Sequence, residues 1–222
     1  MSVLDPPIMS VKEATEIIHS FSRPGKMPGL CYSTSAHECN VGSRLRDVDG
    51  SICNDCYALK NQYLFPNTII AHAKRLEAIR HPRWVDAMVF LIGRWCERND
   101  EPHFRWHDSG DIQDHEHLEK MCEIAERLPW VAFWCPTRER QLVRTYPGEI
   151  PPNLIIRFSM PMQDMAPPQA GLDDGILYSM VTRNLPVPEG VYECPSRYQN
   201  NECGDCRACW DPANQVITYH YH

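Results

Sequence analysis

An alternation of strand-like and helix-like stretches between residues 103 and 182 limits this chain to a small number of folds. Short apolar runs typical of buried strands occupy residues 103–107, 130–135, 154–160 and 176–182, and a last run occupies residues 216–221. Between the first two runs, apolar residues recur at helical spacing, at Leu118, Met121, Cys122, Ala125 and Leu128. Because strands that alternate with helices form parallel sheets with right-handed crossovers, the sequence predicts an α/β fold with a parallel sheet.

The first hundred residues contain three predicted helices around an irregular segment. The helices are expected to begin at Ser10, at Asn67 or Thr68, and at Pro82. Ser10 and Glu13 form a capping box, and the apolar pattern of that first helix extends to Phe21. Residues 26–61 have no sustained periodicity but contain four cysteines. A long irregular segment inside a compact domain is typically functional, so we expect a cysteine-bearing loop there.

Composition excludes several classes of protein. The chain has 222 residues, 43% of them hydrophobic, and a net charge of −7, which is ordinary for a soluble globular protein and disfavours a surface that coats nucleic acid. The sequence has no apolar run of the about eighteen residues that a membrane span needs, and its N-terminus lacks the pattern of a signal peptide. We therefore expect a cytoplasmic protein, with a core over residues 1–189 and a cysteine-rich segment over residues 190–222 packed on it.

The strongest chemical signal is a block of four cysteines near the C-terminus, formed by Cys194, Cys203, Cys206 and Cys209. In a reducing cytoplasm such a block is more typical of a metal site than of disulfides. Four thiolates suit either zinc or an iron-sulfur cluster, but the consecutive spacing C-x2-C-x2-C is that of bacterial ferredoxins. The block therefore favours a [4Fe-4S] cluster, with zinc as the alternative metal.

A second set of cysteines, Cys39, Cys53 and Cys56, lies in the irregular segment. Three thiolates leave one position of a four-ligand site open, and a cluster iron with an open position can bind a substrate or cofactor. Cys31 is an alternative fourth ligand, or an ordinary buried thiol. By contrast, Cys96 and Cys122 lie in apolar helical patterns and are expected in the core.

A polar turn follows the first strand of the alternating region, with the sequence Asp108, Ser109, Gly110 and Asp111. Parallel sheets carry their chemistry at the carboxyl ends of the strands, where this turn, Arg138 and Ser159 fall. Two carboxylates on a flexible backbone are suited to binding a polar or cationic group. An ordinary turn, with Asp114 capping the next helix, explains the same residues.

These motifs together resemble a group of phage and prophage proteins named after a phage gene product numbered eighty-eight. The resemblance runs from about residue 28 to the C-terminus and rests on four motifs: C-x2-C-Y-A ending at Ala58, RWHDSGD ending at Asp111, the strand ending Thr137-Arg138-Glu139, and the C-terminal cysteine block with Trp210. The group in turn resembles radical S-adenosylmethionine enzymes, whose fold is a partial (β/α) barrel. The resemblance to the gene product eighty-eight group implies a phage-encoded protein in the host cytoplasm.

The second resemblance implies roles for the site residues. Cys39, Cys53 and Cys56 would hold a [4Fe-4S] cluster that binds S-adenosylmethionine, and Asp108, Ser109, Gly110 and Asp111 would hold the ligand. The C-terminal block is similar to the auxiliary-cluster extensions of that superfamily. However, the loop spacing here is C-x13-C-x2-C rather than C-x3-C-x2-C, and Asp111 replaces a glutamate, which favours cluster binding over cofactor cleavage.

Two other hypotheses fit the same residues. In the first, the protein is a non-enzymatic module: the metal stabilises the fold, and the fold presents a surface to a host protein or to nucleic acid. Alternatively, all seven cysteines converge on a single site, or the natural metal is zinc.

Overall fold

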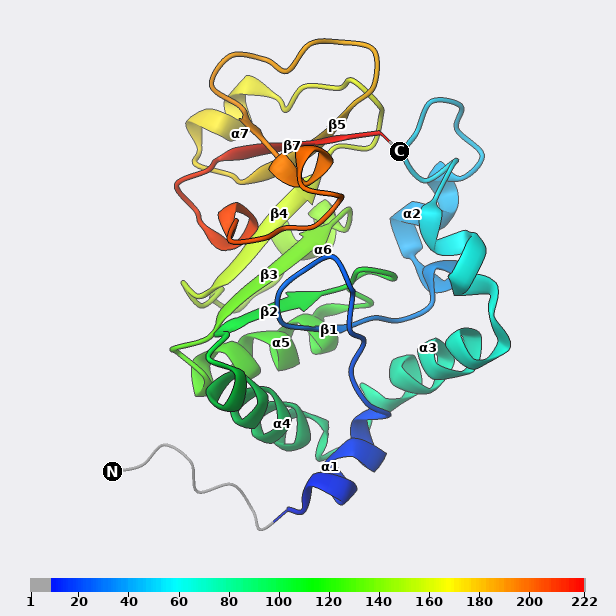
Figure 1. Cartoon of the computed structure of the whole chain (residues 1–222), viewed down its shortest axis with the longest axis vertical. Helices are drawn as coiled ribbons and strands as arrows, with labels where there is room; N and C mark the ends of the chain where they lie inside the picture. Colours follow the sequence, from blue (N-terminus) through cyan, green and yellow to red (C-terminus); the bar gives the residue numbers. More distant parts are fainter. Residues whose placement is uncertain (1–8, 222) are drawn as a thin grey trace.

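A seven-stranded sheet, parallel throughout, forms the centre of the computed structural model, which describes residues 9–221 (Figure 1). Its strands are β1 (Leu30–Tyr32), β2 (His103–Trp106), β3 (Ala132–Thr137), β4 (Leu154–Ser159), β5 (Tyr178–Thr182), β6 (Tyr192–Glu193) and β7 (Val216–His220). The spatial order is β1-β2-β3-β4-β5-β7-β6, so the sheet is open and does not close into a barrel. The predicted α/β fold with a parallel sheet is confirmed.

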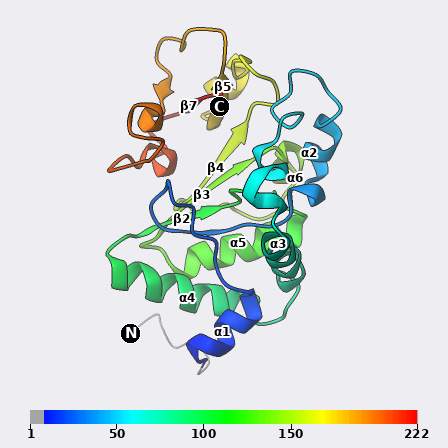
Figure 2. The ribbon, with the colours of Figure 1, turned by 45° about the vertical axis from the view of Figure 1, so that its right-hand side comes forward.

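Seven α-helices connect or cover these strands within the described residues. They are α1 (Val11–Ile18), α2 (Asn40–Leu45), α3 (Pro66–Ala78), α4 (Trp84–Asn99), α5 (His115–Arg127), α6 (Arg140–Arg144) and α7 (Gln169–Asp173). Short 3-10 turns occupy η1 (Ala36–Glu38), η2 (Tyr57–Leu59), η3 (Asn61–Leu64), η4 (Pro195–Tyr198) and η5 (Ala208–Trp210). Helices α4 and α5 lie together against the sheet, and α1 packs on α4 (Figures 1 and 2).

The two faces of the sheet carry different side chains, because successive residues of a strand point to opposite sides. One face packs on the helices and includes Phe104, Trp106 and Phe133, all fully buried. The other face carries a row of residues in register across four strands, consisting of Cys31, Arg105, Trp134 and Ile155. We call this second side the cysteine face, because the C-terminal cysteine segment packs against it.

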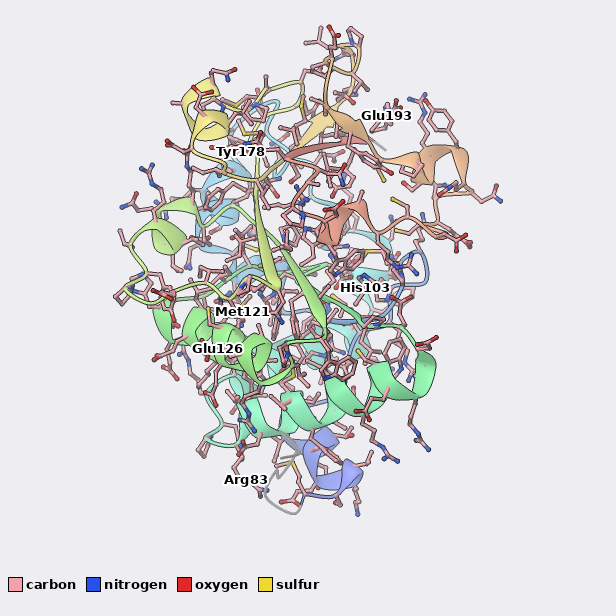
Figure 3. The ribbon with its side chains drawn as sticks, turned by 90° about the vertical axis from the view of Figure 1, so that its left-hand side faces the viewer. Arg83, His103, Met121, Glu126, Tyr178 and Glu193 are labelled. Atoms are coloured by element: carbon pink, nitrogen blue, oxygen red, sulfur yellow. The ribbon has the colours of Figure 1, made fainter. Side chains whose placement is uncertain are left out.

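Contacts of Trp210 place the C-terminal segment on the cysteine face. Its indole packs against His103 of β2 and Trp134 of β3, with ring centroids 5.3 Å apart in each pair. In Figure 3, His103 and Glu193 lie on this side, whereas Met121 lies on the helical side. The segment also supplies β6 and β7 to the sheet, with β7 between β5 and β6.

The helix starts follow the sequence at α1 and differ from it at α3 and α4. Helix α4 begins at Trp84 with Arg83 as its N-cap, so Pro82 lies before the helix and not in its first turn. Ser10 caps α1 by accepting a hydrogen bond from the Glu13 backbone N–H (3.1 Å), as predicted, although α1 ends at Ile18 and not at Phe21. The expectation that Asn67 or Thr68 caps the second helix is wrong. Pro66 occupies the first turn of α3, because its fixed φ suits that position and it has no N–H to satisfy.

No helix in residues 9–221 is long and apolar enough to cross a membrane. The N-terminal stretch in which we expect no signal peptide falls largely on residues 1–8, outside the described part of the chain.

Candidate functional site

The first cysteine set lies in the loop that follows β1, beside the carboxyl ends of the neighbouring strands. Cys39 precedes the first residue of α2, and Cys56 precedes η2. Burial raises the pKa of Cys39, and the charges of Asp111, Cys56 and Cys53 raise it further. The three predicted ligands are therefore close enough for their charges to interact. In the absence of a cation, such a group of thiols favours the protonated form.

Gly42 allows the α2 backbone to approach these cysteines closely. A methyl group at this position would lie 2.9 Å from the Cβ of Cys39 and 3.6 Å from the Sγ of Cys53. Glu139, buried at the end of β3, accepts a hydrogen bond from the Val41 N–H (2.8 Å) and so anchors the start of α2. The loop is long and irregular, but it is held against the sheet at this point.

Arg138 joins the first cysteine set to the ends of β3 and β4. Its Nε donates a hydrogen bond to the Sγ of Cys53 (3.0 Å), while Nη1 donates to the carbonyls of Ser159 (3.2 Å) and Met160 (2.9 Å). A guanidinium in this position stabilises a thiolate at Cys53. The strand ends that the sequence singled out thus meet the cysteine loop.

The Asp111 side chain is hydrogen-bonded within the protein. Its carboxylate accepts hydrogen bonds from the Ile112 N–H (2.8 Å), the Thr137 hydroxyl (2.5 Å) and the Arg138 N–H (2.9 Å). Burial raises the pKa of Asp111 to about 6, against the effect of these donors. The side chain therefore joins the end of β2 to the end of β3.

The remainder of the turn also packs against the chain. Ser109 donates a hydrogen bond to the Thr34 carbonyl (2.9 Å), and its own carbonyl accepts one from the Thr34 N–H (3.0 Å). Gly110 has a φ of +87°, and a side chain there would overlap the hydroxyl of Thr34. Only glycine fits this close approach without strain.

Asp108 lies between Cys31 and the aromatic residues of the loop. It accepts hydrogen bonds from the Cys31 thiol (3.3 Å) and the Tyr63 hydroxyl (2.9 Å), and its backbone carbonyl accepts one from the Tyr57 hydroxyl. Cys31 is fully buried and also lies 3.2 Å from the hydroxyl of Ser33. Its thiol is thus directed toward Asp108 and Ser33, which favours a three-cysteine site at Cys39, Cys53 and Cys56.

The second cysteine set lies on the cysteine face. Burial raises the pKa of Cys203, and the charges of Cys194 and Cys206 raise it further. Burial also raises the pKa of Cys209 to about 12, with a further contribution from Cys194. The four thiols that the spacing predicts to act together are therefore neighbours in space.

Two arginines hold the backbone of this second set. Arg157 of β4, fully buried, donates to the carbonyls of Ala208 (3.3 Å), Cys209 (3.0 Å), Asp211 (2.7 Å) and Asn214 (2.6 Å). Arg207 donates to the carbonyls of Gly204 (2.7 Å) and Cys206 (3.0 Å) and forms an ion pair with Glu101 (2.7 Å). These contacts fix the positions of Cys206 and Cys209.

Tyrosine hydroxyls flank the sulfurs of the second set. The hydroxyl of Tyr192 lies 3.3 Å from the Sγ of Cys206, and that of Tyr219 lies 3.2 Å from the Sγ of Cys209. Both tyrosines come from strands at the same end of the sheet, β6 and β7. A hydroxyl in this position donates to a thiolate and favours its charged form.

The cysteines form neither disulfides nor a compact group for a single metal ion in the described residues. All eleven cysteines lie in the described residues, and none forms a disulfide there. Across residues 9–221, no three His, Cys, Asp or Glu side chains come close enough together to hold a single metal ion. The loop that contains α2 and the segment that contains η4 and η5 lie apart in Figure 1, which favours two separate cysteine sites over one.

Comparison with known proteins identifies the family. The sequence profile described as Gene product 88 matches residues 10–212. The chain belongs to the Gene product 88 family. The match includes both cysteine sets and the turn from Asp108 to Asp111, so the first resemblance noted from the sequence is confirmed. None of the curated proteins matches, and no solved structure matches.

Several residues that organise the site in this Gene product 88 protein were missed at the level of sequence. Gly42 acts on the first cysteine set, and Arg157 and Arg207 act on the second. Glu139 belongs to a motif noted from the sequence, but its hydrogen bond to α2 was not predicted. Arg157 has a sequence signal, because it is a lone arginine inside an apolar strand, LIIRFS. A charged residue in a buried strand needs internal partners.

Proposed function

We propose that this chain is an iron-sulfur protein with two [4Fe-4S] sites, one at Cys39, Cys53 and Cys56 and one at Cys194, Cys203, Cys206 and Cys209. The observation that carries the proposal is the gathering of each cysteine set around positive or hydroxyl groups that stabilise thiolates. Arg138 donates to Cys53, and Tyr192 and Tyr219 lie beside Cys206 and Cys209.

The order of the cysteines in the second set supports a cluster over zinc. Its C-x2-C-x2-C run is the spacing that bacterial ferredoxins use around iron-sulfur clusters. At the first set, the lack of a side chain at Gly42 lets the backbone of α2 lie close to Cys39.

The first site has three cysteines and therefore an open iron position. When bound, a cluster of this kind supplies electrons and a coordination position for a ligand. Arg138 would stabilise the Cys53 thiolate, and Glu139 would hold α2 and hence Cys39 in place. The open position would face the carboxyl ends of the strands, where parallel sheets bind ligands.

The residues of the turn do not fit the amino group of S-adenosylmethionine in the arrangement described. The carboxylate of Asp111 already accepts three hydrogen bonds, and the hydroxyl of Ser109 is bonded to Thr34. Binding through either side chain would break the contacts that join β2 to its neighbours. The proposal therefore rests on cluster binding, and S-adenosylmethionine is a ligand to be tested.

These same internal bonds favour a second candidate function. If the turn is wholly structural, the clusters stabilise the fold and the protein acts as a module for a host protein or nucleic acid. The two candidates differ in one measurable property. An enzyme of the radical S-adenosylmethionine type would show a change in the electron paramagnetic resonance signal of the reduced first site when S-adenosylmethionine is added, and a module would show none.

Anaerobic purification with iron, sulfide and zinc analysis tests the proposal. We expect about eight iron per chain in the unaltered protein and about four after serine replacement of Cys39, Cys53 and Cys56, or of the four C-terminal cysteines. Cys96→Ala, which alters a buried cysteine of α4 outside both sets, is the matched control and should retain all iron. One or two zinc per chain with no iron would contradict the proposal.

A further inference from the structure

Helix α3 has an unusual distribution of side chains, because polar residues lie on its buried face and apolar residues on its exposed face. Two of its three buried residues are His72 and Arg75, which are 7% and 6% exposed. Ile69 and Ile70 of the same helix are 49% and 52% exposed. A helix on the surface of a monomer normally shows the reverse pattern.

The exposed apolar surface continues into the turns before α3. Phe65, which precedes the helix, is 62% exposed, and residues four apart at a helix surface are neighbours, so it adjoins Ile69. Tyr57 of η2 is 56% exposed and packs on Tyr63 of η3, with ring centroids 5.7 Å apart. We call the surface formed by five side chains the α3 patch: Tyr57, Leu64, Phe65, Ile69 and Ile70. Helix α3 lies at the outer edge of the molecule in Figure 1.

Charged side chains lie at the two ends of the α3 patch and not within it. Residues 61–73 contain no Asp, Glu, Lys or Arg, although 23% of the whole chain is charged. At one end Lys60 forms an ion pair with Asp55, and at the other α3 exposes Lys74 and Glu77. Each end therefore carries one cation and one anion. A strongly charged partner such as nucleic acid would find no net charge to bind there.

The size of the α3 patch is that of a dimer interface. Five large apolar side chains that are about half exposed offer roughly 500 Å² of surface, so two copies in contact would bury roughly 1,000 Å² of apolar surface. Homodimer interfaces are about 65% apolar, so the whole contact would be roughly 1,500 Å², the size of a standard specific interface.

We propose that the α3 patch is the contact between two copies of this chain, which pair through α3 about a two-fold axis. In such a contact both copies present the same surface, so that surface must be complementary to itself. An apolar centre with neutral ends meets this requirement. The exposed face of α3 runs from Phe65 to Ala73, which places Ile69 and Ile70 nearest the axis. The inference does not depend on metal binding.

Sedimentation velocity of the anaerobically purified protein tests the pairing. Interfaces of this size bind with micromolar affinity or tighter, so at about 100 μM we expect a particle of about 51 kDa, twice the 25.7 kDa of one chain. The double variant Ile69→Glu, Ile70→Glu should sediment as a monomer, because pairing would bury like charges against one another. Leu185→Glu, at a residue 59% exposed in the loop after β5, is the matched control and should stay dimeric.

A second double variant separates a lost contact from a misfolded chain. Ile69→Lys, Ile70→Lys should also be a monomer, and glutamate and lysine are both good helix formers, so α3 is kept in each variant. When the two variants are mixed, opposite charges face each other across the axis and the dimer should return. A misfolded chain would not recover on mixing.

The other outcomes would overturn the proposal. A monomeric unaltered protein at about 100 μM would leave the α3 patch to a different partner. A dimer that persists in the glutamate variant, or a mixture that stays monomeric, would show that the copies do not pair about this axis. Loss of the dimer in Leu185→Glu would show an association without a defined site. Dimers that contain no iron would instead overturn the proposed function and support this inference.

Discussion

Arg157 illustrates how one residue can connect a strand to a distant loop. Its four carbonyl partners all lie between Ala208 and Asn214, so Arg157→Ala would leave several buried carbonyls without donors. We expect the free energy of unfolding to fall by about 3–5 kcal/mol, as judged by urea denaturation. Arg144→Ala, at an exposed position of α6, is the control and should change it by less than about 0.5 kcal/mol. Equal effects would show that the buried contacts contribute little.

Replacement of Gly42 tests metal content separately from stability. Alanine is the better helix former by about 1 kcal/mol, so Gly42→Ala should favour α2 if sterics did not intervene. The added methyl group would, however, lie only 2.9 Å from the Cβ of Cys39 and displace that cysteine. We expect loss of most iron from the first site and none from the second. Gly25→Ala, where nothing lies within 4 Å of the added group, should keep both.

The cysteines and the turn could be predicted from the sequence, but their partners could not. Spacing alone singled out the C-terminal set, since its last three cysteines lie within seven residues of one another. Asp111 looked like a ligand because a carboxylate at a strand end is typical of a site. Its actual partners, Thr137 and Arg138, are more than 20 residues away, and only the register of β2 and β3 brings them together.

At the scale of elements, Asp114 determines where α5 begins. Its carboxylate accepts a hydrogen bond from the His117 N–H (2.9 Å) and forms an exposed ion pair with Arg80. We expect Asp114→Ala to cost about 1–2 kcal/mol in thermal or urea unfolding. Asp114→Asn keeps an oxygen that caps the helix and loses only the exposed pair, so it should cost about 0.5 kcal/mol or less. Similar losses in the two variants would assign the effect to the ion pair instead.

Long periodic elements were predictable, and short ones were not. Each of the five runs proposed as strands overlaps an observed strand, and α4 and α5 follow their apolar patterns. By contrast, β1 and β6 have three and two residues, too few for any periodicity. They are strands only because β2 and β7 offer them backbone partners, which is a property of the assembled sheet.

At the scale of the whole molecule, buried histidines should control stability in acid. His107 and His117 are buried with ring centroids 5.3 Å apart, and burial lowers the pKa of both, that of His117 to about 3. As the pH falls, these two histidines therefore bind protons at a higher pH in the unfolded chain than in the folded one. Their stabilisation is present above about pH 6.5 and is lost as the pH falls toward 3.

Asp111 acts in the opposite direction, because its pKa is raised to about 6. It contributes stability below its ordinary pKa of about 3.9, and this contribution is lost as the pH rises through 6. Two histidines outweigh one carboxyl group, so we expect the free energy of unfolding to fall by about 1–3 kcal/mol between pH 7 and pH 5.

A series of urea unfolding curves at different pH values checks this expectation. His117→Gln removes one titrating ring while keeping an oxygen acceptor for the Gln113 N–H, and it should flatten the profile. His81→Gln, at an exposed position, should leave the profile unchanged. A profile that is equally steep in all three proteins would exclude the buried pair as the cause.

The strand order has a consequence for how the chain is made. Because β7 lies between β5 and β6, the sheet cannot be completed until residue 220 has left the ribosome. Until then β6 has no neighbour, and Cys194 to Cys209 emerge before Tyr219, which later covers one of their sulfurs. The contacts that hold the cysteines of the loop after β1, from Arg138 and Glu139, come from residues made before β7, although Asp55 of this loop also accepts a hydrogen bond from Tyr221. In the nascent protein, the two cysteine sets would therefore mature in sequence, the N-terminal one first.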